Sequence, residues 1–240
     1  MESKRVKIAA IADIHVGPKN KGSLAPIFSQ ISDEAQVLLL GGDLTYGGLV
    51  EEAELLAQEL TACKIPVIAV LGNHDHEAGK QEEIKAVLTK SRVTVLDGST
   101  EVIQDIGFAG IKGFCGGFDR FVLAPFGEQS IKTFVDEGVQ ESLRLEKALA
   151  SLQTEKKVVL LHYSPIAATV QGEPLEIFPF LGSSRLADPI DRYGVTAVFH
   201  GHAHHGSPEG KTPKKIPVYN VAYALMEKLS PQKPYKIIEV

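Results

Sequence analysis

Five short apolar runs, each followed directly by a polar residue, constrain this chain more than any other feature. They lie at residues 6–12, 37–42, 66–72, 157–162 and 196–201. Each run has the length of a strand, and most show little polar alternation, which is typical of strands buried on both faces of a helix-covered sheet. The runs therefore predict an α/β fold.

The segments between and after these runs predict the rest of the architecture. Three of them carry apolar residues with a helical period: 48–61, 79–90 and 141–153. The segment 101–114 has a period closer to two, and we expect a β-hairpin there with its turn at Gly107. Segments 216–225 and 235–240 are also expected to be strands. Alternating units followed by meandering strands predict a mixed α/β sandwich, with room for two sheets.

Length and composition indicate one globular domain spanning residues 1–240. The 240 residues are 44% hydrophobic and 23% charged, without a repeat, a low-complexity tract or a Pro- or Ser-rich linker. Two long irregular segments, 113–130 and 163–186, interrupt the pattern, and loops of that length in a compact domain are often functional. The net charge of −5 argues against a nucleic-acid polymer as partner.

The expected location is the cytoplasm. Two cysteines, Cys63 and Cys115, cannot form a disulfide framework and suit small core positions in a reducing compartment. The first apolar run is broken by Lys7 and followed by Asp13, so it is too short for a signal peptide or a membrane span. We expect no membrane partner.

Metal-ligating residue types gather at the ends of the apolar runs. All eight histidines lie in or beside these ends: His15, His74, His76, His162, His200, His202, His204 and His205. In an open α/β sheet the carboxyl ends of the strands converge on one crevice, which would bring these groups together. Imidazoles and carboxylates without thiolates favour Mn, Fe, Zn, Ni or Co. A central carboxylate can bridge two such ions, and a pair of ions can drive displacement at phosphorus.

The order of these groups along the chain resembles the calcineurin-like metallophosphoesterases. The family pattern is D-x-H, G-D, G-N-H-D/E, a single H, and G-H-x-H. Its five blocks stand here intact: Asp13-Ile14-His15, Gly42-Asp43, Gly72-Asn73-His74-Asp75, His162 and Gly201-His202-Ala203-His204. Each block alone is weak evidence, but five in order on predicted strand ends are a specific signal that spans most of the chain.

The resemblance implies a four-layer α/β/β/α sandwich with two mixed sheets and a centre of two metal ions. One ion would bind Asp13, His15, Asp43 and His204, and the other Asp43, Asn73, His162 and His202. Asp43 would bridge them. His74 is not a ligand in this family; it would stabilise charge on the phosphoryl oxygens or protonate the leaving group, and Asp75 would orient it.

Several other residues have two interpretations. Arg120, Arg185 and Arg192 can grip a phosphate because a guanidinium matches phosphate oxygens, but a surface arginine or an ion pair is the simpler interpretation. His205 is a further candidate for substrate contact. His200 is expected in the core or behind a ligand, and His76 in a loop.

Tyr46 falls in a G-D-x-x-Y sequence that is similar to purple acid phosphatases, where the tyrosine binds iron. Those enzymes carry D-x-G in the first block, whereas this chain has His15 there. We therefore expect Tyr46 to pack or to support a ligand rather than to bind metal.

The sequence thus predicts a metal-dependent phosphoric ester hydrolase. A small chain with these blocks and no large cap resembles bacterial cytosolic phosphodiesterases as much as phosphatases, and a diesterase is slightly favoured. The substrate is expected to be a small molecule or a phosphoprotein. A repair-type DNA nuclease is disfavoured because the chain has little room for a capping domain.

Two alternatives belong to other classes. The family contains silent scaffolds that bind protein partners, but their usual mark is a lost ligand or a lost histidine at the position of His74, and neither is lost here. A mononuclear oxygenase site needs only two histidines and one carboxylate, which leaves Asn73 and His74 unexplained. The natural substrate, the metal and the oligomeric state stay open.

Overall fold

A computed structural model describes residues 5–240, and its first sheet is built from the N-terminal apolar runs. The strand order is β11-β1-β2-β3-β4, with β11 antiparallel to β1 and the other pairs parallel. The bounds are β1 Lys7–Ile11, β2 Val37–Gly41, β3 Val67–Val70, β4 Val93–Val95 and β11 Lys236–Glu239. The parallel strands point their carboxyl ends to the same edge.

The second sheet has the strand order β5-β6-β7-β8-β10-β9. Its centre is parallel, and the outer strands β5 and β9 pair antiparallel with their neighbours. The bounds are β5 Ser99–Ile103, β6 Ile106–Gly110, β7 Lys156–Leu160, β8 Ala197–His200, β9 Glu209–Lys211 and β10 Pro217–Asn220. All five apolar runs are therefore strands, as predicted.

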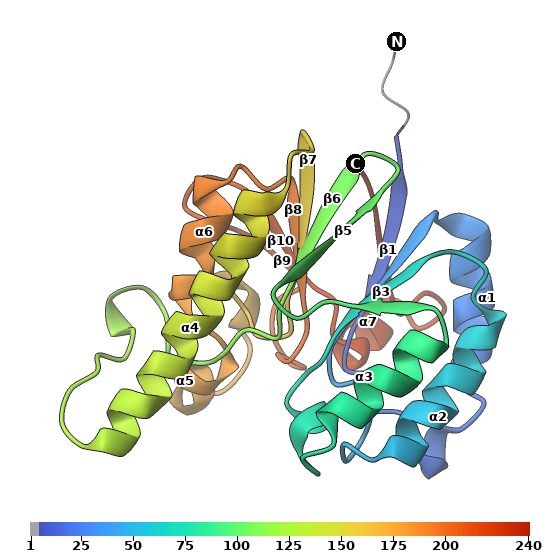
Figure 1. The fold of residues 1–240 in the computed structure, drawn as a ribbon, viewed down its shortest axis with the longest axis horizontal. Helices are drawn as coiled ribbons and strands as arrows, with labels where there is room; N and C mark the ends of the chain where they lie inside the picture. Colours follow the sequence, from blue (N-terminus) through green and yellow to red (C-terminus); the bar gives the residue numbers. More distant parts are fainter. Residues whose placement is uncertain (1–4) are drawn as a thin grey trace.

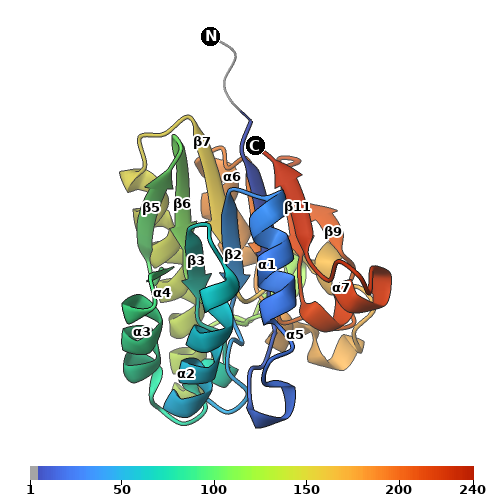
Figure 2. The same cartoon turned by 90° about the vertical axis from the view of Figure 1, so that its right-hand side faces the viewer.

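Helices cover the outer face of each sheet (Figures 1 and 2). The first sheet carries α1 Ala25–Glu34, α2 Val50–Glu59 and α3 Gln81–Lys90, and the second carries α4 Gln129–Ser151 and α6 Ala187–Arg192. The short helices are α5 Phe178–Leu181 and α7 Tyr223–Leu229. Single 3-10 turns lie at Pro18–Asn20, Leu60–Ala62, His74–His76, Asp119–Phe121, Ala167–Val170, Leu175–Ile177 and Ser184–Leu186. This arrangement confirms the four-layer α/β/β/α sandwich.

Side chains of one strand alternate between two apolar layers, which explains the missing polar alternation. In β1, Ile8 and Ala10 face the second sheet, whereas Ala9 and Ile11 pack under the helices of the first. All four are fully buried. Because both faces are dry, a polar residue would lose its hydration anywhere along such a strand.

The predicted hairpin is present, but its turn is not at Gly107. The chain turns at Gln104 and Asp105, whose φ angles are 50° and 63°. Gly107 lies inside β6, where a Cβ would come within 2.8 Å of the Leu152 side chain. The glycine therefore serves close packing against the end of α4, and an extended backbone replaces the predicted turn.

Helical segments account for the other differences from the sequence prediction. The prediction of a strand over 216–225 is wrong beyond Asn220, because α7 begins at Tyr223. Helix α4 begins at Gln129 rather than near residue 141; its first turns are largely exposed and carry a weak apolar pattern. Helix α1 was not predicted. Residues 163–186 are wound into short helical turns rather than irregular.

Both cysteines are free thiols in or against the apolar core, with Cys115 buried and Cys63 partly buried. Among residues 5–240, no helix is long and apolar enough to cross a membrane.

Candidate metal centre

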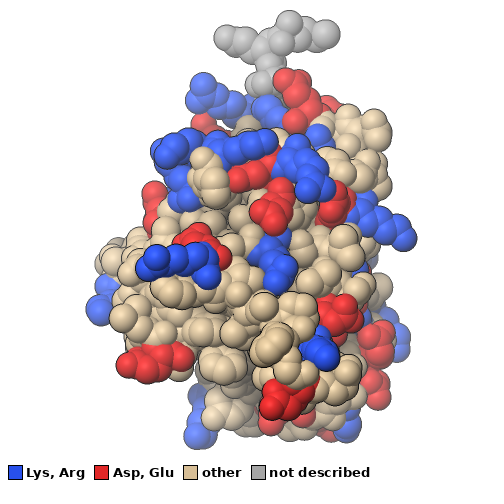
Figure 3. Space-filling model, turned by 90° about the vertical axis from the view of Figure 1, so that its left-hand side faces the viewer, with Lys and Arg blue, Asp and Glu red and all other residues tan. Residues whose placement is uncertain are grey.

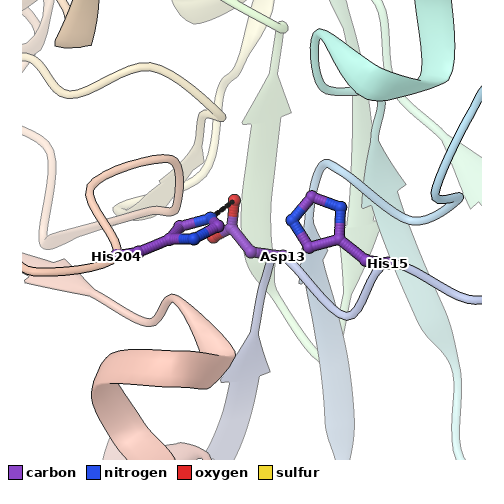
Figure 4. A group of neighbouring side chains, drawn as sticks. All are labelled: Asp13, His15 and His204. Carbon is purple, nitrogen blue, oxygen red and sulfur yellow. Dashed lines mark ion pairs between the residues drawn. The ribbon is translucent and has the colours of Figure 1, made fainter. Parts of the chain in front are cut away.

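The carboxyl ends of β1, β2 and β3 meet those of β7 and β8 at one end of the sandwich. Asp43, behind β2, is central: its carboxylate lies 3.4 Å from His162 Nε2 and 3.9 Å from His15 Nε2. Asp13 lies 3.2 Å from His204 Nε2 (Figure 4). Two sheets thus contribute facing halves of one cluster.

Three groups of donor atoms are close enough to share an ion. They are Asp13 with His15 and His204, His15 with Asp43 and His74, and Asp43 with His162 and His202; the ligand atoms of each group lie within 4.8 Å of one another. Asn73 adjoins the last group, with its Oδ1 2.8 Å from His162 Nε2. The structure therefore brings together all seven predicted ligands, and Asp43 belongs to two of the groups.

The backbone is strained where these ligands leave their strands. Asp13, His15, Asp43 and His202 have φ angles of 55°, 41°, 48° and 69°. Non-glycine residues rarely adopt this left-handed region, and such strain concentrates at functional sites. Here it turns consecutive polar side chains into the same crevice.

The glycines of the motifs let neighbouring ligands approach. A Cβ on Gly72 would overlap the carboxylate of Asp43, and one on Gly201 would overlap the carboxylate of Asp13. The Asp13 carboxylate also accepts hydrogen bonds from the His202 amide at 2.9 and 3.0 Å. Close packing of strand ends against carboxylates therefore explains why glycine precedes Asn73 and His202.

Asp75 does not contact the His74 ring, which corrects the expected role. Its fully buried carboxylate accepts hydrogen bonds from the amides of Leu44, Thr45 and Gly72 and from the Thr45 hydroxyl. The His74 ring is held instead by the Tyr46 carbonyl, 2.6 Å from Nδ1. Asp75 therefore fixes the turn after β2, and this turn carries the Tyr46 carbonyl that contacts His74.

Tyr46 contacts His74 through its backbone carbonyl, but its side chain does not pack in the core. Its side chain is 65% exposed, and its ring lies 6.2 Å from the His74 ring and 6.5 Å from the His15 ring. The packing interpretation is wrong because the turn after β2 leaves the core at this point. No sequence signal marks the carbonyl as the functional group, since every residue has one.

Burial sets the charge of the cluster. It lowers the pKa of His15 to about 4 and of His202 to about 3, and it lowers that of His162 well below its usual value. These rings are neutral at pH 7, the form that binds metal. The hydrogen bond that His204 donates to the Asp13 carboxylate raises the pKa of His204, while burial raises the pKa of Asp13 to about 6.

The residues present fit a metal centre. Two buried carboxylates lie beside neutral imidazoles, and no thiolate is among them. The buried Nδ1 of His15 has no hydrogen-bond partner in the described part of the chain. Buried carboxylates are stable only when paired or coordinated, so a divalent cation matches this donor set.

The remaining candidates lie outside this cluster of donors. Arg120 stacks on the Phe121 ring, Arg185 donates to the Leu123 carbonyl, and Arg192 pairs with Glu146. His205 is exposed, and its amide donates to Glu173. The ion pair of Arg192 matches its simpler interpretation. Phosphate binding by Arg120 and Arg185 stays a prediction.

His200 is fully buried and its Nε2 lies 2.8 Å from the Thr169 hydroxyl, as expected for a residue behind the ligands. His76 lies in the 3-10 turn after the third block. The Phe180 carbonyl lies 3.1 Å from His202 Nε2, a contact that the sequence did not indicate.

The family model for calcineurin-like phosphoesterases matches residues 6–206. The chain belongs to the calcineurin-like phosphoesterase family. This membership supports phosphoester hydrolysis as the activity and a metal centre as its site. No curated protein matches the chain.

Solved structures of the same fold are distant in sequence. The phosphopantetheinyl hydrolase of Mycobacterium tuberculosis is 14% identical with a TM-score of 0.72, over 98% of this chain and 96% of that one. TT1561 of Thermus thermophilus is 13% identical with a TM-score of 0.56, over 99% of both chains. GAP50, the anchor in the inner membrane complex of Plasmodium, is 15% identical with a TM-score of 0.55, over 92% of this chain and 73% of that one. At such identities the likeness concerns the fold.

Proposed function

We propose that this calcineurin-like phosphoesterase is a dinuclear metal-dependent hydrolase that prefers phosphodiesters to monoesters. The observation that carries the proposal is the position of Asp43, whose carboxylate shares one donor group with His162 and His202 and another with His15, and His15 also belongs to the group of Asp13 and His204. One group would comprise Asp13, His15, Asp43 and His204, and the other Asp43, Asn73, His162 and His202. The ions would be Mn, Fe, Zn, Ni or Co.

When bound, a pair of ions supplies Lewis acidity toward the phosphoryl oxygens and a deprotonated water as nucleophile. The protein contributes the preorganised carboxylates and neutral rings that hold such ions. Strained backbone and close-packed glycines fix these groups before substrate arrives, so little reorganisation accompanies binding.

We propose that His74 transfers a proton to the leaving group. A carbonyl can only accept, so the contact with Tyr46 puts a proton on Nδ1 and leaves Nε2 facing the cluster, 4.0 Å from the Asp43 carboxylate. In its protonated state, Nε2 would donate to the leaving oxygen as the phosphorus–oxygen bond breaks. Its side chain is 40% exposed, so it reaches the open side of the site.

The preference for diesters rests on this openness and on the fact that residues 5–240 include no large cap over the site. The side chains of His74 and His204 are 40% and 36% exposed. Both ester arms of a diester can therefore lie outside the ligand cluster while the phosphate contacts it. We further propose a single domain, a cytoplasmic location, and a small-molecule or phosphoprotein substrate.

The test is Mn-supplemented hydrolysis of bis-p-nitrophenyl phosphate beside p-nitrophenyl phosphate. We expect a higher kcat/KM for the diester, a fall of about 10²–10⁴-fold in His74→Ala, and no change in His76→Gln as the matched histidine control. Full activity in His74→Ala would refute the assigned proton transfer, and a monoester preference would refute the diesterase.

A silent scaffold that binds protein partners is the alternative. It predicts a protein purified without chelator that carries no stoichiometric metal and hydrolyses neither ester. Metal content measured by elemental analysis separates the two, because the hydrolase should retain up to two ions per chain.

A further inference from the structure

Exposed apolar side chains gather in the two long loops that flank the metal centre. Among residues 5–240, twelve large apolar side chains are exposed, and seven of them lie between residues 121 and 131 or between 175 and 180. Figure 3 shows the face that includes the loop before α4, where charges of both signs are scattered among uncharged side chains. Such a concentration marks a binding surface rather than chance.

These loops enclose a groove of about 490 Å³. Its walls include Phe118, Phe121, Leu175, Phe178 and Pro179, and the polar side chains on them are those of Asp119 and Gln171. The size lies in the range of small-ligand sites, which are mostly apolar with few polar groups. Without a lysine or arginine in its lining, the groove does not suit a phosphate.

The groove is joined to the metal centre through His202 and Ala203. Phe180, which follows the groove residue Pro179, holds His202 through its carbonyl. Ala203, between two predicted ligands, packs in one apolar cluster with Phe118, and Phe178 packs against that cluster. The groove therefore backs onto the loop that carries the ligands.

Backbone hydrogen bonds hold the two loops against each other. The Gly116 amide donates to the Pro179 carbonyl at 2.7 Å, and the Gly117 amide donates to the Gly182 carbonyl at 2.9 Å. The Leu123 amide donates to the Gly116 carbonyl at 2.7 Å. The walls are thus fixed to each other, so the groove is formed before a ligand binds.

We propose that this groove binds the apolar arm of an amphiphilic phosphoester, an alkyl or acyl chain, while the phosphate lies at the metal centre. The inference rests on the proposed function and narrows its substrate class. The Asp119 carboxylate, in an otherwise uncharged lining, repels the anionic end of such a substrate, and the metal ions that the neighbouring cluster of histidines and carboxylates would hold attract it. The exposed Leu175 and Phe121 side chains, 73% and 70% accessible, lie where the arm would cover them.

The kinetic test uses p-nitrophenyl alkyl phosphodiesters from methyl to octyl with the Mn-loaded enzyme. Each buried methylene should raise kcat/KM by up to about fourfold, mainly through KM, until the groove is full. Leu175→Ser and Phe178→Ala should flatten the series, so that the ratio of kcat/KM for the octyl ester to kcat/KM for the methyl ester falls toward one. Leu229→Ser, at an exposed leucine on α7 (56% accessible), is the matched control and should keep the slope.

A flat series in the wild type, or an unchanged slope in both groove variants, would overturn the proposal. If short esters give no slope and the protein instead binds phosphatidylcholine vesicles through these residues, the patch is a lipid-surface contact and the proposal also fails.

A second measurement does not depend on turnover. The neutral fluorophore N-phenyl-1-naphthylamine should bind Asp43→Asn as it binds the wild type, be displaced by octanol, and bind at least tenfold more weakly to Leu175→Ser. Absence of this binding overturns the proposal that the groove binds an apolar arm, even if methyl esters are hydrolysed. If the protein binds the fluorophore but hydrolyses no ester, the proposed function is refuted, whereas the assignment of the groove as an apolar binding site is supported.

Discussion

The two halves of the site differ in how they are built. The half from β1, β2 and β3 consists of tight turns directly after the strands, with left-handed backbone at Asp13, His15 and Asp43. The half from β7 and β8 adds His162, His202 and His204, and it is surrounded by two loops with exposed apolar side chains. Under the proposed function, both halves would supply metal ligands, whereas only the loops of the second half would offer an apolar surface to the substrate.

The largest effect is expected from Asp43→Asn, because it removes the charge shared by two donor groups. We expect the second ion to be lost and turnover of any ester to fall by about 10³-fold or more. Elemental analysis and initial rates check this. Two bound ions and unchanged rates in the variant would contradict the central role proposed for Asp43 in the metal centre.

The next effect tests close packing at the boundary between the halves. In Gly201→Ala, the added Cβ would overlap the Asp13 carboxylate and lie 2.6 Å from Ala12 Cβ. We expect metal affinity to fall at least tenfold, measured by titration of the apo-protein. The control is Gly194→Ala: its φ is 61° with open space around it, so it should lose about 1 kcal/mol of stability and keep its metal affinity.

A smaller effect is expected inside the first half, at Asp75. Four donors point at its two oxygens, and in Asp75→Asn an amide group would face one of them. The turn that carries the Tyr46 carbonyl should loosen, at a cost of about 1–3 kcal/mol in stability. We expect kcat to fall about 10- to 100-fold with metal content unchanged. If kcat were unaffected, Asp75 would be a purely structural residue.

The sequence predicted the first half better than the second. Its ligands follow buried strands directly, and parallel strands deliver their ends to one edge, so order and spacing sufficed to group Asp13, Asp43 and Asn73. The candidate ligands after β7 and β8 were predicted to join them in the same way. The sequence did not predict the helical turns of residues 163–186, the early start of α4 or the apolar groove.

Backbone atoms explain much of what was missed. The contacts of Tyr46 and Phe180 with active-site rings use their carbonyls, and carbonyls leave no mark in a residue pattern. The family resemblance implied that Asp75 orients the His74 ring, but the two neighbouring residues point in different directions and have different partners. Tertiary contacts, rather than local spacing, decide such roles.

The smallest effect concerns Arg185, which joins the two loops of the second half. Its guanidinium donates to the Leu123 carbonyl at 3.1 Å, and its own carbonyl accepts from the Ser142 hydroxyl at 2.7 Å. If it only braces these loops, Arg185→Met should change kcat and KM for a small diester by less than about threefold, since one exposed hydrogen bond contributes about 1 kcal/mol. If it grips phosphate, KM should rise at least tenfold and more steeply at low salt, because a charge-assisted contact is lost. Kinetics at two salt concentrations decide between these roles. A large, salt-dependent rise in KM would show that a residue of the loops around the second half binds the phosphate of the substrate.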